Sequence, residues 1–300
     1  MKAVRFSRFG GPEVLETTEL PDPHPGPGQI RIAVRAAGIN PSDWKKRKGL
    51  MDQGLPQTLG HEAAGTVDEL GEGVTDTAIG DPVFGFTAQE GAQAELAVLS
   101  HYAPIPPPLD FTAAAALPAA IETATRALDQ LGAGPGTTLL INGASGTVGS
   151  AAVQLAVVRG ARVLGTASPA NHAYLRTLGA EPLTYGPGLP DRVRTLAPDG
   201  IDLALDIAGN GILPELSQLT GSAQHVITLA DVPGARKHGV RFSTGESGRA
   251  LHALDTIGEL IQSGRFQPPP THTFPLADAA EAHQAGEHGH LRGKLVLLVG

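Results

Sequence analysis

Three small residues at the start of a predicted helix could bind a diphosphate group. The segment Thr137–Gly149 reads TTLLINGASGTVG, and Ala144, Gly146 and Gly149 hold the three positions of a dinucleotide-binding turn. Gly146 would let the main chain approach a pyrophosphate, and Gly149 would let the helix pack closely on the preceding strand. Free N–H groups and the helix dipole favour negative charge at that point. Because Ala144 replaces the usual first glycine, a plain tight turn in another kind of α/β domain stays an alternative.

The residues on either side of this turn have the patterns of a strand and a helix. Residues 138–141 are apolar or β-branched, and one apolar face recurs at Val148, Ala152, Leu155 and Ala156. Further strands are predicted at 162–166, 203–207 and 225–229, alternating with helices around 147–159, 170–178 and 211–219. Strands separated by helices indicate a parallel sheet with right-handed crossovers.

The first 105 residues have a different texture. Short strands separated by Gly/Pro turns are predicted at 2–6, 29–36, 60–70, 82–86 and 95–99, with a short helix at 40–49, which is typical of an irregular barrel or sandwich. After the parallel region we expect helices at 248–263 and 276–285 and a closing strand at 295–299. This tail is too small for a domain of its own, so we expect it to return to the first one.

Composition excludes several classes of function. A chain of 300 residues suggests two domains, and a net charge of −8 argues against a nucleic-acid or anionic-membrane partner. The absence of cysteine removes disulfides, thiolate nucleophiles and cysteine-based zinc sites. No signal sequence and no apolar run of membrane-spanning length is visible, so we expect a soluble, cytoplasmic protein.

Seven segments in a fixed order make the chain similar to the medium-chain dehydrogenase/reductase superfamily, in particular to its zinc-free quinone oxidoreductases. This resemblance covers essentially the whole chain and implies an α/β fold. A GroES-like β-rich catalytic domain would comprise residues 1–112 and 256–300, and a Rossmann doubly wound parallel-sheet domain would comprise residues 113–255. The segments are AAGINPSDW (36–44), LGHEAAGTV (59–67), GDPVFGF (80–86), LPAAIETATRAL (117–128), NGASGTVGSAAVQLA (142–156), LALDIAG (203–209) and GKLVLLV (293–299).

The resemblance also addresses zinc. The three ligand positions of the zinc-dependent relatives correspond here to Asn40, His61 and about Ala119. Asn40 and Ala119 are not zinc ligands, and one histidine cannot make the usual three-ligand site. The four-cysteine structural zinc lobe is missing too, so we expect no metal. An improvised site from Asp43, His61 and Glu62 is the alternative.

The expected activity follows from the missing zinc ligands. Without a Lewis acid to ionise an alcohol, hydride addition to a conjugated carbonyl is the more plausible chemistry, because hydrogen-bond donors and positioning suffice there. The resemblance thus implies an NADPH-dependent oxidoreductase transferring hydride to a quinone or α,β-unsaturated carbonyl. Alternatives are an alcohol dehydrogenase or enoyl reductase of the same superfamily, or a nucleotide-binding protein with little turnover. We expect the loops around 44–55 and 84–90 to select the substrate.

The catalytic candidates that the resemblance implies are Asn40, Asp43, His61 and Thr123, and Ser42 matches a proton-relay hydroxyl of alcohol-oxidising relatives. Asn40 would bind the substrate carbonyl or a cofactor hydroxyl, or else cap a turn before Pro41. Asp43 would orient the site or start a helix, and Ser42 would relay a proton or cap that helix. His61 would relay a proton or be a packed, hydrogen-bonded histidine. Thr123 would contact the nicotinamide carboxamide.

The choice of nicotinamide cofactor rests on the end of the second strand. No Asp or Glu occurs there, and the first acid is Glu181, so no carboxylate would repel a 2′-phosphate. Ser168 and Tyr185 match residues around the phosphate in relatives that use NADP, while His172 stands where lysine is usual, and NADPH is favoured. Asp206 would line the cofactor cleft or be a helix N-cap. The full expected cofactor-binding set is Asn40, Thr123, Gly143, Ala144, Ser145, Gly146, Thr147, Val148, Gly149, Thr166, Ser168, His172, Tyr185, Asp206, Leu229 and Ala230.

The segment Val240–Phe242 bears on oligomerisation. It corresponds to a strand that pairs across a two-fold axis in relatives, which implies a homodimer. An ordinary edge strand is the alternative.

Overall fold

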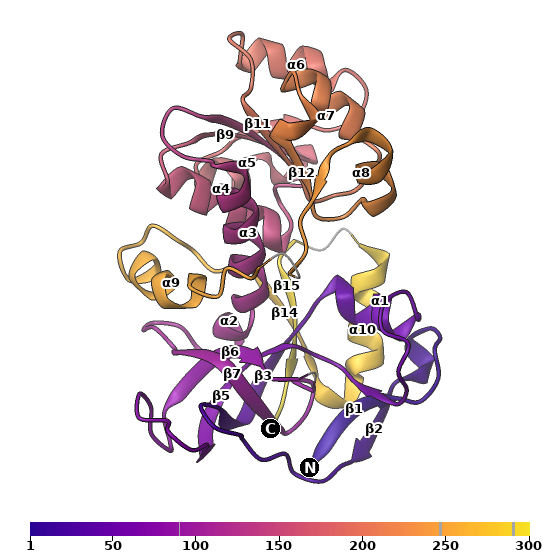
Figure 1. Cartoon of the computed structure of the whole chain (residues 1–300), viewed down its shortest axis with the longest axis vertical. Coiled ribbons are helices and arrows are strands. Elements are labelled where there is room, and N and C mark those ends of the chain that lie inside the picture. The colour runs from indigo at the N-terminus through magenta and orange to yellow at the C-terminus, as the bar shows by residue number, and fades with distance from the viewer. Residues whose placement is uncertain (90, 246–247, 290–291) are drawn as a thin grey trace. The chain divides into compact units, whose positions relative to one another are not determined.

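The chain forms two compact units in a computed structural model that describes residues 1–89, 91–245, 248–289 and 292–300. Unit 1 comprises Met1–Ala119, Leu254–Gln262 and Pro268–Gly300, and unit 2 comprises Ala120–Ala253 and Ser263–Gln267. The C-terminal strands and helix thus belong to the same unit as the N-terminal strands. The predicted α/β fold class is confirmed, with one β-rich unit and one parallel-sheet unit (Figure 1).

Unit 1 is built on a six-stranded sheet with the order β14-β15-β3-β5-β6-β7, in which β3 also pairs with β7. All pairs are antiparallel except β14 with β15, and a smaller sheet has the order β2-β1-β4. The strands are β1 (Lys2–Phe6), β2 (Glu16–Glu19), β3 (Ile30–Ile39), β4 (Gln57–Thr58), β5 (Glu62–Leu70), β6 (Pro82–Thr87), β7 (Leu96–Pro104), β14 (Thr271–Pro275) and β15 (Lys294–Leu298).

Burial along β3 shows how this sheet makes its core. Ile30, Ile32 and Val34 alternate with more exposed residues, as expected for a strand with one covered face, and they join one apolar cluster. From Ala36 to Ile39 every residue is buried, which requires cover on both faces. Helix α2 (Phe111–Ala115) packs on β3 and β5.

Two helices of unit 1 pack on each other. Helix α1 (Pro41–Arg47) follows β3 directly, and α10 (Ala279–His288) lies beside it (Figure 1). A Cβ on Gly286 would come 2.8 Å from the Trp44 ring, so the glycine is what permits this close approach. Helix α9 (Ala253–Gln262) begins five residues later than the predicted start at 248.

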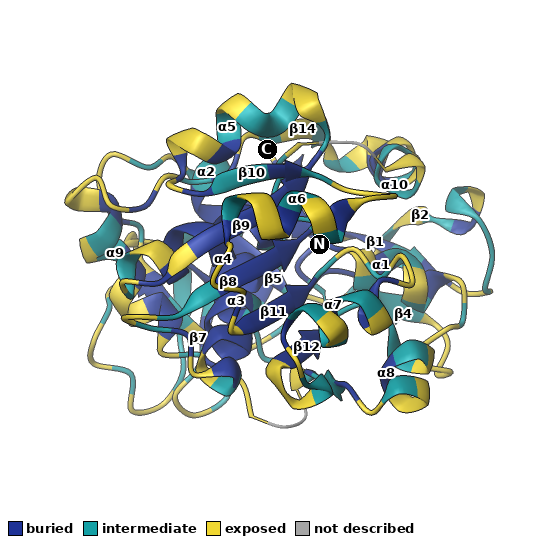
Figure 2. Cartoon of the chain, turned by 90° about the horizontal axis from the view of Figure 1, so that it is seen from above, coloured by how far each residue is buried: buried dark blue, intermediate teal, exposed yellow. Residues whose placement is uncertain are grey.

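Unit 2 contains a six-stranded parallel sheet with the order β10-β9-β8-β11-β12-β13. Figure 2 shows β8, β9 and β11 as buried, with exposed outer faces on α6 and α7. Leu140 and Ala204 are fully buried in the core shared with these helices. The elements are α3 (Pro118–Leu131), β8 (Thr138–Asn142), α4 (Thr147–Val158), β9 (Arg162–Ala167), α5 (His172–Thr177), β10 (Glu181–Thr184), α6 (Leu189–Leu196), β11 (Leu203–Asp206), α7 (Leu213–Leu219), β12 (Val226–Thr228), α8 (Val232–His238) and β13 (Arg241–Phe242).

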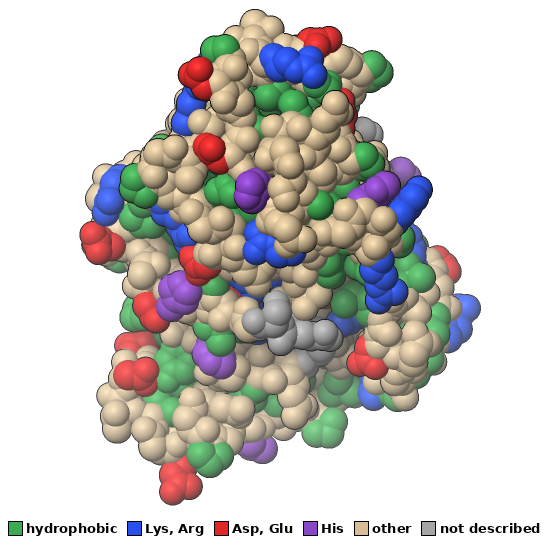
Figure 3. All heavy atoms as spheres, turned by 45° about the horizontal axis from the view of Figure 1, so that its top comes forward, with side chains coloured by type: hydrophobic (Ala, Val, Ile, Leu, Met, Phe, Trp, Pro, Cys, Tyr) green, Lys and Arg blue, Asp and Glu red, His purple; other side chains and the backbone are tan. Residues whose placement is uncertain are grey.

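Helix length and surface charge complete the description. None of the helices within the described residues combines the length and the hydropathy needed to cross a bilayer. On the face seen in Figure 3, basic, acidic and histidine side chains are dispersed among neutral ones.

Candidate active site

The predicted dinucleotide-binding turn lies between β8 and α4 in unit 2. Gly143 has a φ of +87°, a conformation that favours glycine. A Cβ on Gly149 would lie 2.2 Å from the Gly143 carbonyl oxygen, so α4 can pack this closely only with glycine there. Helix α4 has 12 residues and no side-chain cap, which leaves the main-chain N–H groups of its first turn directed out of its N-terminus.

The alanine in the first motif position is accommodated by a second glycine. Ala144 is fully buried, and a Cβ on Gly165 of β9 would lie only 2.8 Å from the Ala144 Cβ. The methyl group that the usual glycine lacks therefore occupies space left by Gly165. The turn keeps its conformation, since the Ala144 N–H donates to the Thr166 carbonyl at 3.0 Å.

A buried polar network at the C-terminal ends of β8, β9, β11 and β12 holds this turn in place. Thr166 Oγ1 accepts from the Gly143 N–H at 3.1 Å and donates to Asn142 Oδ1 at 2.8 Å. Asn142 Nδ2 donates to Asp206 Oδ1, and Thr228 Oγ1 donates to Asp206 Oδ2 at 2.7 Å. Thr166 and Asp206 are almost fully buried, so they hold the strand ends in register. The N-cap alternative for Asp206 is wrong, because α7 begins at Leu213 with Ile212 as its N-cap.

The residues proposed for a 2′-phosphate follow two paired strands. Ala167 of β9 pairs with Thr184 of β10, so Ser168 and Tyr185 leave the same edge of the sheet side by side. His172 begins α5, and among the described residues its Nε2 is buried without a hydrogen-bond partner. Asn171, which no sequence motif indicated, lies between two serines, with its Nδ2 3.4 Å from Ser145 Oγ and 3.3 Å from Ser168 Oγ.

In unit 1, Asn40 and Asp43 form the start of α1. Asn40 is the N-cap, so the N-cap alternative for Ser42 is wrong. Asp43 accepts from the Asn40 N–H at 2.7 Å and from the Gly60 N–H at 3.3 Å, which is the helix-start role considered for it. Asn40 and Asp43 have the arrangement of a capping box, in line with the turn-capping alternative for Asn40, and the Asn40 amide makes further hydrogen bonds outside the helix start.

The amide of Asn40 lies in a buried charged cluster that the sequence motifs did not predict. Lys294 Nζ donates to Asn40 Oδ1 and to Glu62 Oε1, both at 2.5 Å, and Asn40 Nδ2 donates to Glu62 Oε1 at 2.6 Å. Glu62 Oε2 accepts from the Ala119 N–H at 2.7 Å. Burial acts to raise the pKa of the Glu62 carboxyl, but the positive charge of Lys294, the His61 ring and these hydrogen bonds hold that pKa below its ordinary value.

These contacts leave little support for an improvised metal site. The Lys294 ammonium already neutralises Glu62, and Asp43 is occupied by main-chain N–H groups. Within the part of the chain that the structure describes, no group of three His, Cys, Asp or Glu side chains is arranged to hold a metal ion. His61 is half-buried with its ring parallel to that of Phe86, and it has no side-chain hydrogen bond to another described residue.

Thr123 belongs to a second buried polar group, on α3 in unit 2. Its hydroxyl donates to Glu122 Oε2 at 3.2 Å, and Arg126 Nε donates to Glu122 Oε1 at 2.8 Å. The Ala250 N–H also donates to Glu122, and Arg126 reaches Ser243. With its proton directed to Glu122, the Thr123 oxygen offers lone pairs to a donor such as a carboxamide.

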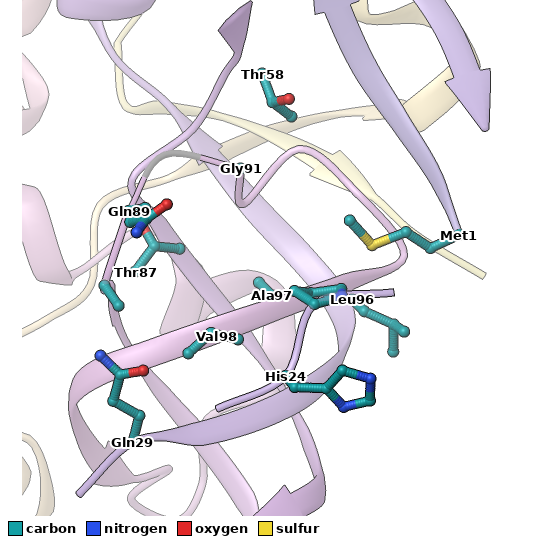
Figure 4. Close-up of a pocket in the computed structure, with 12 residues that line it drawn as sticks. Met1, His24, Gln29, Thr58, Thr87, Gln89, Gly91, Leu96, Ala97 and Val98 are labelled. Carbon is teal, nitrogen blue, oxygen red and sulfur yellow. The ribbon is translucent and has the colours of Figure 1, made fainter. Parts of the chain in front are cut away.

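A separate hollow in unit 1 has a volume of about 250 Å³ (Figure 4). None of the catalytic candidates lines it. Residues 87–89 of the predicted substrate loop do, whereas residue 90 of that loop lies outside the described residues. The other lining residues are Met1, Pro23, His24, Gln29, Thr58, Gly91, Leu96, Ala97 and Val98.

A β-rich unit joined to a parallel-sheet unit with a dinucleotide-binding turn is the architecture of nicotinamide-dependent dehydrogenases. Comparison with known proteins places the chain in the same class. A model of the alcohol dehydrogenase GroES-like domain matches residues 26–107, and a model of the zinc-binding dehydrogenase family matches residues 178–297. The chain belongs to the medium-chain dehydrogenase/reductase superfamily, in its quinone oxidoreductase-like family, and is an oxidoreductase.

Individual relatives match over almost the full length of this chain. Rat quinone oxidoreductase is 32% identical, covering 100% of this chain and 98% of the relative. The chloroplastic NADPH-dependent alkenal/one oxidoreductase of Arabidopsis thaliana is 30% identical, covering 99% of this chain and 79% of the relative. The structure of the Coxiella burnetii quinone oxidoreductase is 30% identical, with a TM-score of 0.85, and covers 100% of this chain and 99% of that chain.

Proposed function

We propose that this protein is an NADPH-dependent, metal-independent reductase of quinones or α,β-unsaturated carbonyls. The observation that carries the proposal is the Asn40–Glu62–Lys294 cluster, in which an ammonium group stands beside the carboxylate that a metal ion would need. A second cation there would be repelled, and the amide of Asn40 offers a neutral hydrogen bond instead. The activities named for the rat and Arabidopsis relatives support this class of reaction.

The residues of unit 2 fit a nicotinamide dinucleotide phosphate. The glycines of the β8–α4 turn leave room for a diphosphate at the N-terminus of α4. No carboxylate follows directly after β9. The next acidic residue, Glu181, accepts a hydrogen bond from Arg162, and both residues begin their strands, at the end of the sheet away from Ser168 and Tyr185. Ser168, His172 and Tyr185 would hold the 2′-phosphate, and Thr123 would accept from the carboxamide. The bound cofactor would supply the hydride.

The residues of unit 1 would handle the substrate oxygen and the proton. Hydride addition to a conjugated carbonyl places negative charge on oxygen, and a fixed N–H donor stabilises that charge. Asn40 would be this donor. His61 is half-buried and could pass a proton from solvent to the product, while Asp43 fixes the start of α1.

The test is a substrate panel with the untagged, chelator-dialysed protein. NADPH oxidation is followed with 9,10-phenanthrenequinone, an alkenal and a simple ketone, and each assay is repeated with NADH. We expect turnover of the quinone or the alkenal, no turnover of the ketone, and a kcat/KM at least tenfold higher for NADPH. Turnover of a primary alcohol that requires added zinc, or tight NADPH binding with no turnover of any acceptor, would reject the proposal in favour of an alternative.

Two further proposals concern assembly and location. We propose a homodimer formed through β13, which lies at one of the two edges of the described parallel sheet, where a second copy of the strand could pair with it. We also propose that the protein works in the cytoplasm, where its lack of cysteine costs it no structural disulfide. Light scattering of the purified protein checks the first proposal, and cell fractionation checks the second.

A further inference from the structure

The Asn40 amide lies between two groups of opposite hydrogen-bonding character. Lys294 Nζ is 2.5 Å from Asn40 Oδ1, and Glu62 Oε1 is 2.6 Å from Asn40 Nδ2. An ammonium group only donates and an ionised carboxylate only accepts. In the flipped amide, Nδ2 would face the ammonium and Oδ1 would face the carboxylate, so both contacts would be repulsive. The two neighbours therefore fix one orientation of the amide.

This arrangement is enclosed by the fold. Glu62 is fully buried and Lys294 is 3% exposed, so both charges interact in a low-dielectric environment. The Ala119 N–H occupies the other oxygen of Glu62. Gly38 provides the space, since a Cβ there would lie 2.5 Å from Glu62 Oε1. Both charged side chains are thus shielded from solvent where they contact Asn40.

The orientation decides what Asn40 offers to a ligand. One Nδ2 proton is directed to Glu62, and the second has no partner among the described residues. A cation bonded to Oδ1 withdraws electron density from the amide, which makes the remaining N–H a stronger donor. An oxygen that gains negative charge is the ligand group that such a donor favours.

We propose that Lys294 and Glu62 are positioning residues that hold Asn40 as a hydrogen-bond donor to the substrate oxygen on which negative charge develops. This inference rests on the proposed reductase function. It adds that Asn40 donates the hydrogen bond and the substrate oxygen accepts it. The preferred substrates carry a carbonyl or quinone oxygen at this point, and compounds that offer only a donor group there are rejected.

The activity test uses a double variant, because removal of one charge alone would leave the other buried and unpaired. K294M/E62Q removes both charges and leaves a neutral side chain that can either donate to Asn40 or accept from it. We expect the NADPH Kd to stay within twofold and kcat to fall at least tenfold. N40A alone should lower kcat to a similar level, and N40A in the K294M/E62Q background should lower it by less than a further twofold.

A matched control removes an ion pair elsewhere in the same six-stranded sheet. Arg31 of β3 bonds Asp68 of β5 at 2.9 Å, away from Asn40 in both strands, and R31M/D68N should keep kcat within twofold of the wild type. If the effects of K294M/E62Q and N40A multiply as independent changes, or if K294M/E62Q keeps the wild-type kcat, the inference is wrong.

A measurement that needs no turnover tests the orientation itself. The chain has four asparagines (Asn40, Asn142, Asn171 and Asn210), so ¹⁵N-asparagine labelling gives four side-chain NH₂ signals, and N40A identifies one. We expect one Asn40 Nδ2 proton to exchange with solvent at least tenfold more slowly in the wild type than in K294M/E62Q. Equal exchange in both proteins would refute the positioning role. If only the proposed function is wrong, the wild-type protein will show no turnover, but its Asn40 Nδ2 proton will still exchange slowly with solvent.

Discussion

Acidification should destabilise unit 1 through His283, a buried histidine whose charged form is disfavoured in the folded protein. His283 of α10 is fully buried, and among the described residues neither ring nitrogen has a hydrogen-bond partner. Burial, assisted by the positive charge of Arg47, lowers the pKa of this imidazole to about 3. The ring is therefore neutral in the folded protein and becomes protonated first in the unfolded chain.

The sign and the magnitude follow from this difference in pKa. Between the folded value of about 3 and the ordinary value of 6.5, the unfolded chain binds more protons, so the free energy of unfolding falls as the pH falls. Linkage gives a loss of about 2 kcal/mol between pH 7 and pH 5 from this one side chain, at 1.36 kcal/mol per pKa unit. Stability from this source is fully present only above pH 6.5.

The assay is urea unfolding followed by tryptophan fluorescence at pH 7, 6 and 5. The only tryptophan is Trp44 of α1, against which Gly286 of α10 packs, so its emission reports on the element that carries His283. H283L should remove the loss of about 2 kcal/mol, so its unfolding free energy should depend less steeply on pH than that of the wild type. The matched variant Q284L, exposed on the same helix, should follow the wild type. Parallel profiles for H283L and the wild type would refute the reasoning.

Three other perturbations test the nucleotide turn and the absence of a metal. G149A would place a Cβ 2.2 Å from the Gly143 carbonyl oxygen, and calorimetry should show the NADPH affinity reduced at least tenfold. G165A should cost about 1–3 kcal/mol of unfolding free energy by overpacking against Ala144, and A144G/G165A should restore most of it in urea titrations. Dialysis against a chelator should leave the rate of NADPH oxidation unchanged, whereas a loss that added zinc restores would contradict the metal-independent mechanism.

Elements with a strong local sequence pattern were predicted correctly, and elements whose local pattern is weak were missed. The apolar residues before the glycine turn and the amphipathic pattern after it correspond to β8 and α4 almost residue for residue. Strands β10 and β14 were missed, since each contains a proline and few buried residues and forms through pairing with a neighbour. Helix α6 follows Gly188 in a left-handed conformation and has proline in its first turn, which reads as loop in isolation.

The residues that we propose to contact the cofactor were easier to predict from the sequence than the residues that hold them in place. The glycines of the turn have a local reason visible in the sequence, namely space for a diphosphate and for helix packing. Asn142 and Thr228 show no such pattern, because their function is to join β8, β11 and β12 through Asp206 across 64 and 22 residues of chain. Asn171 likewise depends on the path of α5 back toward Ser145.

Lys294 shows why strand register carries the functional information that a sequence pattern lacks. The sequence presents it only as the first residue of an apolar closing strand, although a buried lysine needs an acidic partner. Leu295 pairs with Ile39 and Val296 with Gly38 in the antiparallel β15–β3 ladder, and the same register continued by one residue sets Lys294 opposite Asn40. A slip of one residue would send the lysine to the other face of the sheet. The packing of β15 on β3 thus places Lys294 beside Asn40, and under the proposed mechanism substitutions that shift this register should lower kcat before they prevent folding.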